Sequence, residues 1–249
     1  MALLELDDLT KRYGGVTAVS NVTMRVEAGE VRAVIGPNGA GKTTLFHLIT
    51  GVVKPTAGSI RFGGREITGQ PSHCICQAGL SRTFQLTSLF PEMSVRENMI
   101  LSAQARLPHA WRPWGGRVVF AEARIRGDEA LERLGLTSVA GRRAGLLSHG
   151  DQRLLEVAMA LAQRPRVLLL DEPTQGLSVE ETLSAVETLA GLLRDGSLTV
   201  LLVEHDMEVV FRLAGKITVL HRGAVIADGD PDAVKADRDV QAAYLGGYA

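Results

Sequence analysis

The sequence predicts an α/β fold with a mostly parallel sheet, an N-terminal antiparallel β part and an inserted helical part. Two apolar runs, at 167–170 and 198–203, each follow a segment with helical periodicity, which is typical of parallel strands buried on both faces. Near the N-terminus, apolar residues alternate with polar ones at 22–26, which indicates a strand with one exposed face. Between about 90 and 150 the strand patterns stop and helical periodicity takes over.

Glycine-containing turns bound the other expected elements. Turns are expected at 27–29, at Gly63-Gly64 and at Arg222-Gly223, and Gly51 ends the first helix. Strands are expected at 4–9, 22–26, 30–35, 58–62, 167–170, 198–203, 216–221 and 224–228, and helices at 42–50, 96–107, 118–134, 151–163 and 179–194.

Composition narrows the class of protein. The formal charge of −1 argues against a dedicated nucleic-acid binder, which usually carries a basic excess. We find no apolar stretch of the roughly 20 residues that a membrane-spanning helix needs, and no basic-then-apolar start typical of a secretory signal. Cys74 and Cys76 are too few for a zinc site and poorly spaced for a disulfide, so we expect a reducing compartment.

A glycine-rich segment after the strand at 30–35 matches the phosphate-binding pattern G-x-x-x-x-G-K-[ST]. Its glycines let backbone N–H groups surround a phosphate at a helix N-terminus, where the helix dipole favours an anion. Lys42 would reach the β- and γ-phosphates, and the Thr43 hydroxyl would bind Mg²⁺. The alternative is a glycine-rich turn with an incidental lysine. The pattern predicts a P-loop protein that binds a nucleoside triphosphate.

Two acidic residues, Asp171 and Glu172, follow the apolar strand at 167–170. Asp171 is placed to hold the Mg²⁺ shell, which is the Walker B role in P-loop enzymes. Glu172 can direct a carboxylate at the attacking water, because hydrolysis needs a group that orients and deprotonates it. The alternative is a strand that simply ends in solvated acidic residues.

Further segments, all in family order, resemble the motifs of ABC transporter ATPases. The segment 147–153 is similar to their L-S-G-G-Q signature, and Gln85 stands at the position of their Q-loop. His205 stands where they have a switch histidine, and Tyr13 where they have an aromatic residue that stacks on adenine. The resemblance covers essentially the whole chain.

This resemblance implies one ABC ATPase domain over 1–249. A RecA-like core with the antiparallel β part would occupy about 1–90 and 151–249, and a helical subdomain that ends in the signature about 90–150. The implied catalytic residues are Glu172, His205, Gln85 and Lys42, and the implied Mg²⁺ ligands are Thr43, Gln85 and Asp171. ATP would be bound by Tyr13, Gly36, Pro37, Asn38, Gly39, Ala40, Gly41, Lys42, Thr43 and Thr44, and in trans by Ser148 and Gly150 of a second subunit.

Three residues depart from the family pattern. His149 stands where Gly or one of a small set of other residues is usual, and Asp151 stands where the signature usually has Gln. The Asp151 carboxylate would weaken a closed dimer by repelling polyphosphate, unless it points away or pairs with Arg153. Ser178 replaces the Asp or Asn that is common in the D-loop. We therefore expect ATP binding, with slow hydrolysis in the absence of partners.

Within the family, the sequence resembles the ATPases of branched-chain amino acid importers. The segments that carry this resemblance are 79–85, 93–98, 203–207 and 243–246. The sequence has no long coiled coil, second phosphate loop or transmembrane segment, which argues against repair, translation and fused-exporter members. Urea or amide import, lipopolysaccharide export and, outside the family, a P-loop small-molecule kinase remain alternatives.

The resemblance also implies partners. We expect separate transmembrane permease subunits, an ATPase dimer with itself or with a sibling, a solute-binding protein as an indirect partner, and no nucleic acid. The chain would then lie peripherally at the cytoplasmic face of the plasma (inner) membrane. Trp111 and Trp114, in an insertion at 108–116, are either docking anchors or locally packed rings. The transported solute does not contact this type of subunit.

Overall fold

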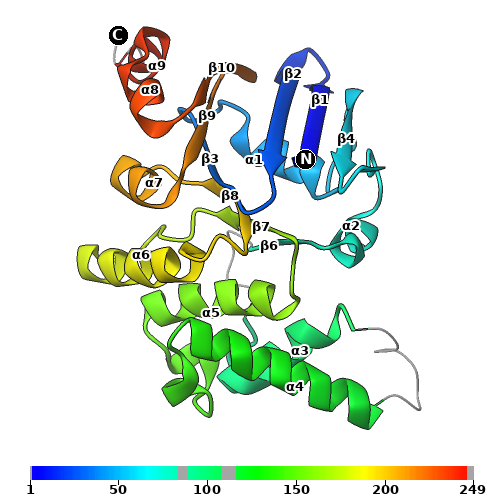
Figure 1. Cartoon of the computed structure of the whole chain (residues 1–249), viewed down its shortest axis with the longest axis vertical. Helices are drawn as coiled ribbons and strands as arrows, with labels where there is room; N and C mark the ends of the chain where they lie inside the picture. Colours follow the sequence, from blue (N-terminus) through cyan, green and yellow to red (C-terminus); the bar gives the residue numbers. More distant parts are fainter. Residues whose placement is uncertain (1, 84–88, 108–115, 246–249) are drawn as a thin grey trace. The chain divides into compact units, whose positions relative to one another are not determined.

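The computed structural model describes residues 2–83, 89–107 and 116–245 (Figure 1). The chain divides into two compact units. The first unit comprises Met1–Ala78 and Gly196–Ala249, and the second comprises Gly79–Asp195. Among the described residues, no helix combines the length and the apolar character that crossing a bilayer requires.

An antiparallel sheet forms the N-terminal part of the first unit. Apolar side chains such as Leu6 of the first strand and Met24 of the second lie opposite each other and are buried. Along the second strand, the residues that alternate with the buried ones are more exposed. This alternation is what the sequence predicts for a sheet with one covered face. The strands lie in the order β2-β1-β4-β5 and are β1 (Ala2–Tyr13), β2 (Val16–Glu27), β4 (Ala57–Phe62) and β5 (Arg65–Glu66).

The other four strands described in the first unit are mostly parallel. Strand β3 pairs in parallel with both β8 and β9, and β10 pairs antiparallel with β9. Nearly every residue of β3 and β8 is buried, as expected for strands covered on both faces. The bounds are β3 (Val31–Ile35), β8 (Thr199–Val203), β9 (Lys216–His221) and β10 (Ala224–Gly229).

Helices cover these strands and close a common core. Ala33 and Ile35 of β3 pack with Val210, Val234 and Val240, which come from three different helices near the C-terminal end (Figure 1). The core therefore fastens the C-terminal helices to the strand that precedes the phosphate loop. The helices of this unit are α1 (Lys42–Ile49), α2 (Ser72–Ala78), α7 (Met207–Leu213), α8 (Pro231–Ala236) and α9 (Arg238–Leu245).

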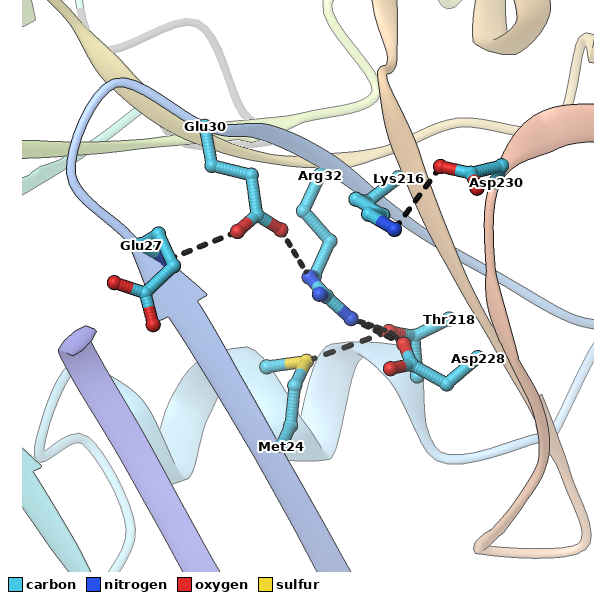
Figure 2. Close-up of polar contacts among 8 residues, drawn as sticks. All are labelled: Met24, Glu27, Glu30, Arg32, Lys216, Thr218, Asp228 and Asp230. Atoms are coloured by element: carbon cyan, nitrogen blue, oxygen red, sulfur yellow. Dashed lines mark hydrogen bonds and ion pairs between the residues drawn. The ribbon is translucent and has the colours of Figure 1, made fainter. Parts of the chain in front are cut away.

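An ionic network around Arg32 also connects β3 to the C-terminal part of the chain (Figure 2). Arg32 of β3 is only 5% exposed, so its guanidinium needs partners in the protein. It donates to Glu30 at 2.6 Å, to the Thr218 hydroxyl at 2.8 Å and to the carboxylate of Asp228. Because Thr218 lies on β9 and Asp228 on β10, one side chain joins three strands. Nearby, Lys216 pairs with Asp230 at 3.0 Å.

The second unit contains a parallel strand pair and several helices. Strand β6 (Leu80–Arg82) pairs with β7 (Val167–Asp171), which is buried along its whole length. Arg96 of α3 and Asp128 of α4 form an ion pair at 3.0 Å. The helices are α3 (Val95–Gln104), α4 (Gly116–Arg133), α5 (His149–Ala162) and α6 (Val179–Leu193), with short 3-10 turns η1 (Thr137–Val139) and η2 (Ala144–Leu146).

All thirteen predicted elements are present, with ends that differ by a few residues. The largest difference is at the N-terminus, where β1 and β2 are both longer than the predicted strands 4–9 and 22–26. The sequence analysis did not predict β5, β6, α2, α7, α8 and α9, each of eight residues or fewer. Segments this short carry too few periodic positions to be recognised from a pattern.

Candidate active site

The phosphate loop connects β3 to α1, as its sequence pattern requires. Gly36 and Gly41 are held against other backbone segments, and a Cβ there would lie 2.1 Å from the Leu220 carbonyl oxygen and 2.4 Å from that of Ala18. Gly41 also has φ of 106°, a conformation that strains other residues. Packing and backbone geometry therefore both require glycine here. The Gly223 N–H donates to the Ala40 carbonyl at 3.0 Å and braces the loop from the β9–β10 turn.

Lys42 begins α1 and is 6% exposed. Its Nζ donates to the carbonyl oxygens of Gly36 at 2.6 Å and Pro37 at 3.2 Å, so the ammonium lies over the loop itself. Thr43 is exposed and Thr44 half-buried in the same helical turn. No acidic side chain lies in this first turn, so the helix dipole favours an anion there.

Tyr13 ends strand β1 in the first unit. Its side chain is 48% exposed, and the Lys11 ammonium lies 4.9 Å from the ring centroid. An exposed aromatic face is what base stacking requires, although its neighbour already forms a cation–π contact. His205 is exposed after β8, and its backbone N–H donates to the buried Glu204 carboxylate at 3.0 Å.

Asp171 ends strand β7 in the second unit and is 1% exposed. Its Oδ2 accepts from Arg82 at 2.5 Å, and its backbone N–H donates to the Thr83 hydroxyl at 3.1 Å. Arg82 and Thr83 lie at the end of β6, so the strand pairing brings them beside the acid. The sequence analysis gave Arg82 no role; only the β6–β7 pairing reveals that it neutralises Asp171.

The second carboxylate oxygen of Asp171 is available to bind a cation. Oδ1 is buried and has no hydrogen-bond partner among the described residues, which leaves one carboxylate oxygen available as a ligand. The described residues hold no group of three or more His, Cys, Asp or Glu side chains that would cage a metal by themselves. Mg²⁺ commonly binds through one or two protein ligands together with nucleotide phosphates, so this donor set suits it.

Glu172 follows Asp171 in an unusual backbone conformation. Its φ is 50°, in the left-handed region that glutamate rarely adopts, and the residue is only 5% exposed. Strain of this kind persists where the surrounding structure holds it, and it is found often at functional sites. The turn after it is closed by a hydrogen bond from the Gln175 N–H to the Glu172 carbonyl at 3.1 Å.

The signature segment forms the N-terminus of α5. Ser148 is the N-cap, and its hydroxyl oxygen accepts from the Asp151 N–H at 3.1 Å. The Gly150 N–H donates to Oε1 of Glu181, in the first turn of α6, at 3.2 Å. The pairing considered for Asp151 with Arg153 is absent, because Arg153 pairs with Glu156 at 2.9 Å, one helical turn further on.

Three predicted residues cannot be placed. Gln85, Trp111 and Trp114 lie outside the described residues. The structure positions Thr83, two residues before Gln85, by three hydrogen bonds to β7. Its N–H and its hydroxyl donate to the Leu169 carbonyl at 2.9 Å and 3.4 Å, and the hydroxyl oxygen accepts from the Asp171 N–H.

Comparison with known proteins assigns these motifs to a family. A family model described as ABC transporter matches residues 19–175, more than half of the chain. The chain belongs to the ABC transporter ATP-binding family. It is an ABC-type ATPase with a nucleotide-binding domain, and the predicted fold class is confirmed. A second model, described as branched-chain amino acid ATP-binding cassette transporter, matches residues 224–249.

Curated relatives of this ABC ATPase span the same length. It is 42% identical to the high-affinity branched-chain amino acid transport ATP-binding protein BraF of Pseudomonas aeruginosa, over 98% of both chains. It is 39% identical to the protein LivG of Escherichia coli, which carries the same description, again over 98% of both chains.

Solved structures give the same result. A nucleotide-free ATP-binding cassette from an ABC transporter matches with a TM-score of 0.85 and 29% identity, over 98% of this chain and 99% of that one. A dimeric cassette in a post-hydrolysis state, bound to ADP and Pi, matches with a TM-score of 0.75 and 26% identity, over 92% and 98%.

The C-terminal segment matched by the second family model lies against the phosphate loop of this ABC ATPase. Ile226 and Asp239 from that segment line a pocket of about 640 Å³, and Asn38 and Gly39 of the loop line it as well. The ion pair between Arg32 and Asp228 joins the same segment to β3. The C-terminal segment is thus built onto the nucleotide-binding part of the fold.

Proposed function

We propose that this chain is the ATP-hydrolysing subunit of an ABC importer that takes up branched-chain amino acids through separate permease subunits. The observation that carries the proposal is a phosphate loop with two glycines required by packing, in a chain that also ends a buried strand with Asp171 and Glu172. The solute class is supported by full-length relatives described as branched-chain amino acid transport proteins, and by the C-terminal family match.

The phosphate loop binds the triphosphate. Backbone N–H groups at 36–44 surround the phosphates, and Lys42 moves its ammonium from the loop carbonyls to the β- and γ-phosphates. Tyr13 stacks on the adenine. Thr43, Gln85 and Asp171 would hold Mg²⁺, which would neutralise charge on the phosphates. Arg82 pairs with Asp171 and orients its carboxylate.

The cleavage step depends on a water molecule activated by Glu172. Its buried carboxylate takes a proton from the water as the water oxygen attacks the γ-phosphorus. The bond from that phosphorus to the β–γ bridging oxygen breaks, and ADP leaves with the bridging oxygen. His205 and Lys42 stabilise the negative charge that develops in the transition state, and Gln85 orients the water. These roles rely on positioning and charge, which are the main sources of catalysis in phosphoryl transfer.

The working unit is a dimer of ATPase subunits, either two copies of this chain or this chain with a sibling. Ser148 and Gly150 complete the site of the partner subunit by contacting the γ-phosphate bound there. The dimer docks on permease subunits at the cytoplasmic face of the plasma membrane. Solved structures of similar ATP-binding cassettes that are described as dimeric support this arrangement.

Solute uptake tests this function. The chain is co-expressed with candidate permease subunits from the same organism, and the complex is reconstituted in vesicles with a solute-binding protein. We expect ATP-dependent uptake of leucine, isoleucine and valine. Lys42→Ala should weaken ATP binding by about 10- to 100-fold, the range expected for loss of a charged hydrogen bond, and should abolish uptake.

Lys54→Ala is the matched control, because Lys54 is an exposed lysine outside the loop. It should leave uptake unchanged. Uptake of urea or short amides without leucine would overturn the proposed solute class, and unimpaired ATP binding by Lys42→Ala would overturn the role of the loop.

A further inference from the structure

Glu181, in the first turn of α6, connects two segments of the second unit. Its Oε2 accepts from the Ser178 backbone N–H at 3.0 Å and from the Ser178 hydroxyl at 2.9 Å. Its Oε1 accepts from the Gly150 N–H at 3.2 Å, across 31 residues of sequence. One carboxylate therefore joins the N-terminus of α6, which follows the Asp171–Glu172 strand end, to the signature turn of α5.

A side chain at position 150 would lie directly against Glu181. A Cβ there would lie 3.4 Å from both Cβ and Cγ of Glu181, an ordinary van der Waals distance, so the two segments are in close contact. The Gly150 N–H is also one of the donors that a helix N-terminus leaves without a partner in its own helix. In this fold that donor is satisfied by the carboxylate of another helix.

Glu181 is an anion at neutral pH. The hydrogen bond from the Ser178 N–H, followed by those from the Gly150 N–H and the Ser178 hydroxyl, lowers the pKa of Glu181, and His149 lowers it further. Burial acts in the opposite direction. A negative charge is thus held at the signature turn by three hydrogen bonds.

We propose that Glu181 is a positioning residue that holds the Gly150 N–H until the γ-phosphate bound by the partner subunit displaces it. The proposal rests on the proposed function, in which Gly150 contacts that phosphate. Two anions compete for one N–H group and repel each other, so closure of the dimer requires Glu181 Oε1 to leave Gly150. Because Glu181 Oε2 stays bonded to Ser178, displacing Oε1 from Gly150 also affects Ser178, which lies in the segment that follows Glu172.

This role gives a physical reason for serine at position 178. The hydroxyl accepts from the Glu181 N–H at 3.3 Å and donates to Glu181 Oε2. An aspartate at this position could also cap α6, but its carboxylate would have no proton to donate and would repel Glu181. Ser178 and Glu181 therefore form a matched pair.

The competition is tested by substituting Glu181→Gln in the complete transporter purified with its permease subunits. Glutamine at this helix position keeps the capping interaction with Ser178 but carries no charge. We expect the KM for ATP to fall by about fivefold, the factor expected for removing one repulsion between charges about 4 Å apart in water, with little change in kcat.

Glu97→Gln is the matched control. Glu97 occupies the same position in the capping box of α3, and its carboxylate bonds only Ser94 among the described residues. This variant should leave the KM unchanged, and both variants should melt close to the wild type. An unchanged or raised KM in Glu181→Gln, or an equal shift in Glu97→Gln, would overturn the proposal.

ATP turnover by the wild-type complex and by its Glu172 variant distinguishes failure of the proposed function from failure of the Glu181 proposal. A complex that does not hydrolyse ATP, or that keeps its turnover when Glu172 is replaced, contradicts the proposed function, and the Glu181 proposal falls with it. A complex that hydrolyses ATP through Glu172 but does not respond to Glu181→Gln contradicts the Glu181 proposal alone.

Discussion

The N-termini of α3 and α6 have nearly the same sequence and the same local structure. Each begins with Ser-Val and has glutamate at the third helical position, and each forms a complete capping box. The serine hydroxyl accepts from the glutamate N–H at 3.2 Å in α3 and at 3.3 Å in α6. Only in α6 does the glutamate also accept from a residue of another helix, Gly150.

The difference shows which contacts a capping box needs and which contact in α6 goes beyond capping. The box in α3 satisfies the free backbone donors of its own helix, and it does nothing further in the described part of the chain. The box in α6 does the same, and the second carboxylate oxygen of Glu181 also accepts from Gly150 in the signature turn. A motif that is fully explained by helix capping can therefore also carry a second contact, to which we assign a role in nucleotide-driven closure.

The largest effect on stability is expected when either box loses its serine. Ser94→Ala and Ser178→Ala each remove an N-cap acceptor, which costs about 1 kcal/mol of folding stability. In a chain of this size that lowers the melting temperature by about 2–4 °C. Scanning calorimetry of the two variants should give similar losses. A loss several times larger for Ser178→Ala would show that the two boxes are not locally equivalent.

A smaller effect is expected on acidification. Hydrogen bonds lower the pKa of both glutamates below the usual 4.5: mainly the Ser94 hydroxyl for Glu97, and mainly the Ser178 N–H for Glu181. A carboxyl whose pKa is lower in the folded state stabilises the fold above its unfolded pKa, and this contribution is lost as the pH falls through the folded pKa. Stability should therefore decline below about pH 4.5.

Urea midpoints measured between pH 6 and pH 3 check this expectation. Glu97→Gln and Glu181→Gln should each show a shallower acid decline than the wild type, because each lacks one of the groups that titrate. A variant whose midpoint falls in parallel with that of the wild type would show that its glutamate does not contribute.

Much of the nucleotide site was predictable because its parts are contiguous in sequence. The phosphate loop at 36–43, the strand with Asp171 and Glu172, and the cap at Ser148 are each defined by neighbours within a few residues. The parallel strands were predictable for the same reason, since burial on both faces makes them apolar throughout.

Contacts between distant residues were not predictable from these patterns. Arg82 and Asp171 are 89 residues apart, and only the pairing of the short strand β6 with β7 brings them together. Of the two possibilities given for Asp151, pairing with Arg153 does not occur, because Arg153 pairs with Glu156 on the next helical turn. The Glu181–Gly150 contact also depends on tertiary packing. The roles given to the individual site residues remain predictions.

The most direct test of the central claim is ATP turnover by the complex that carries Glu172→Gln. We predict that turnover falls by about 100-fold or more, the usual contribution of a positioned general base, while ATP still binds at least as tightly as to the wild type. Glu180→Gln, at an exposed position in the first turn of α6, should retain wild-type turnover. Turnover by Glu172→Gln within about threefold of the wild type would contradict the account.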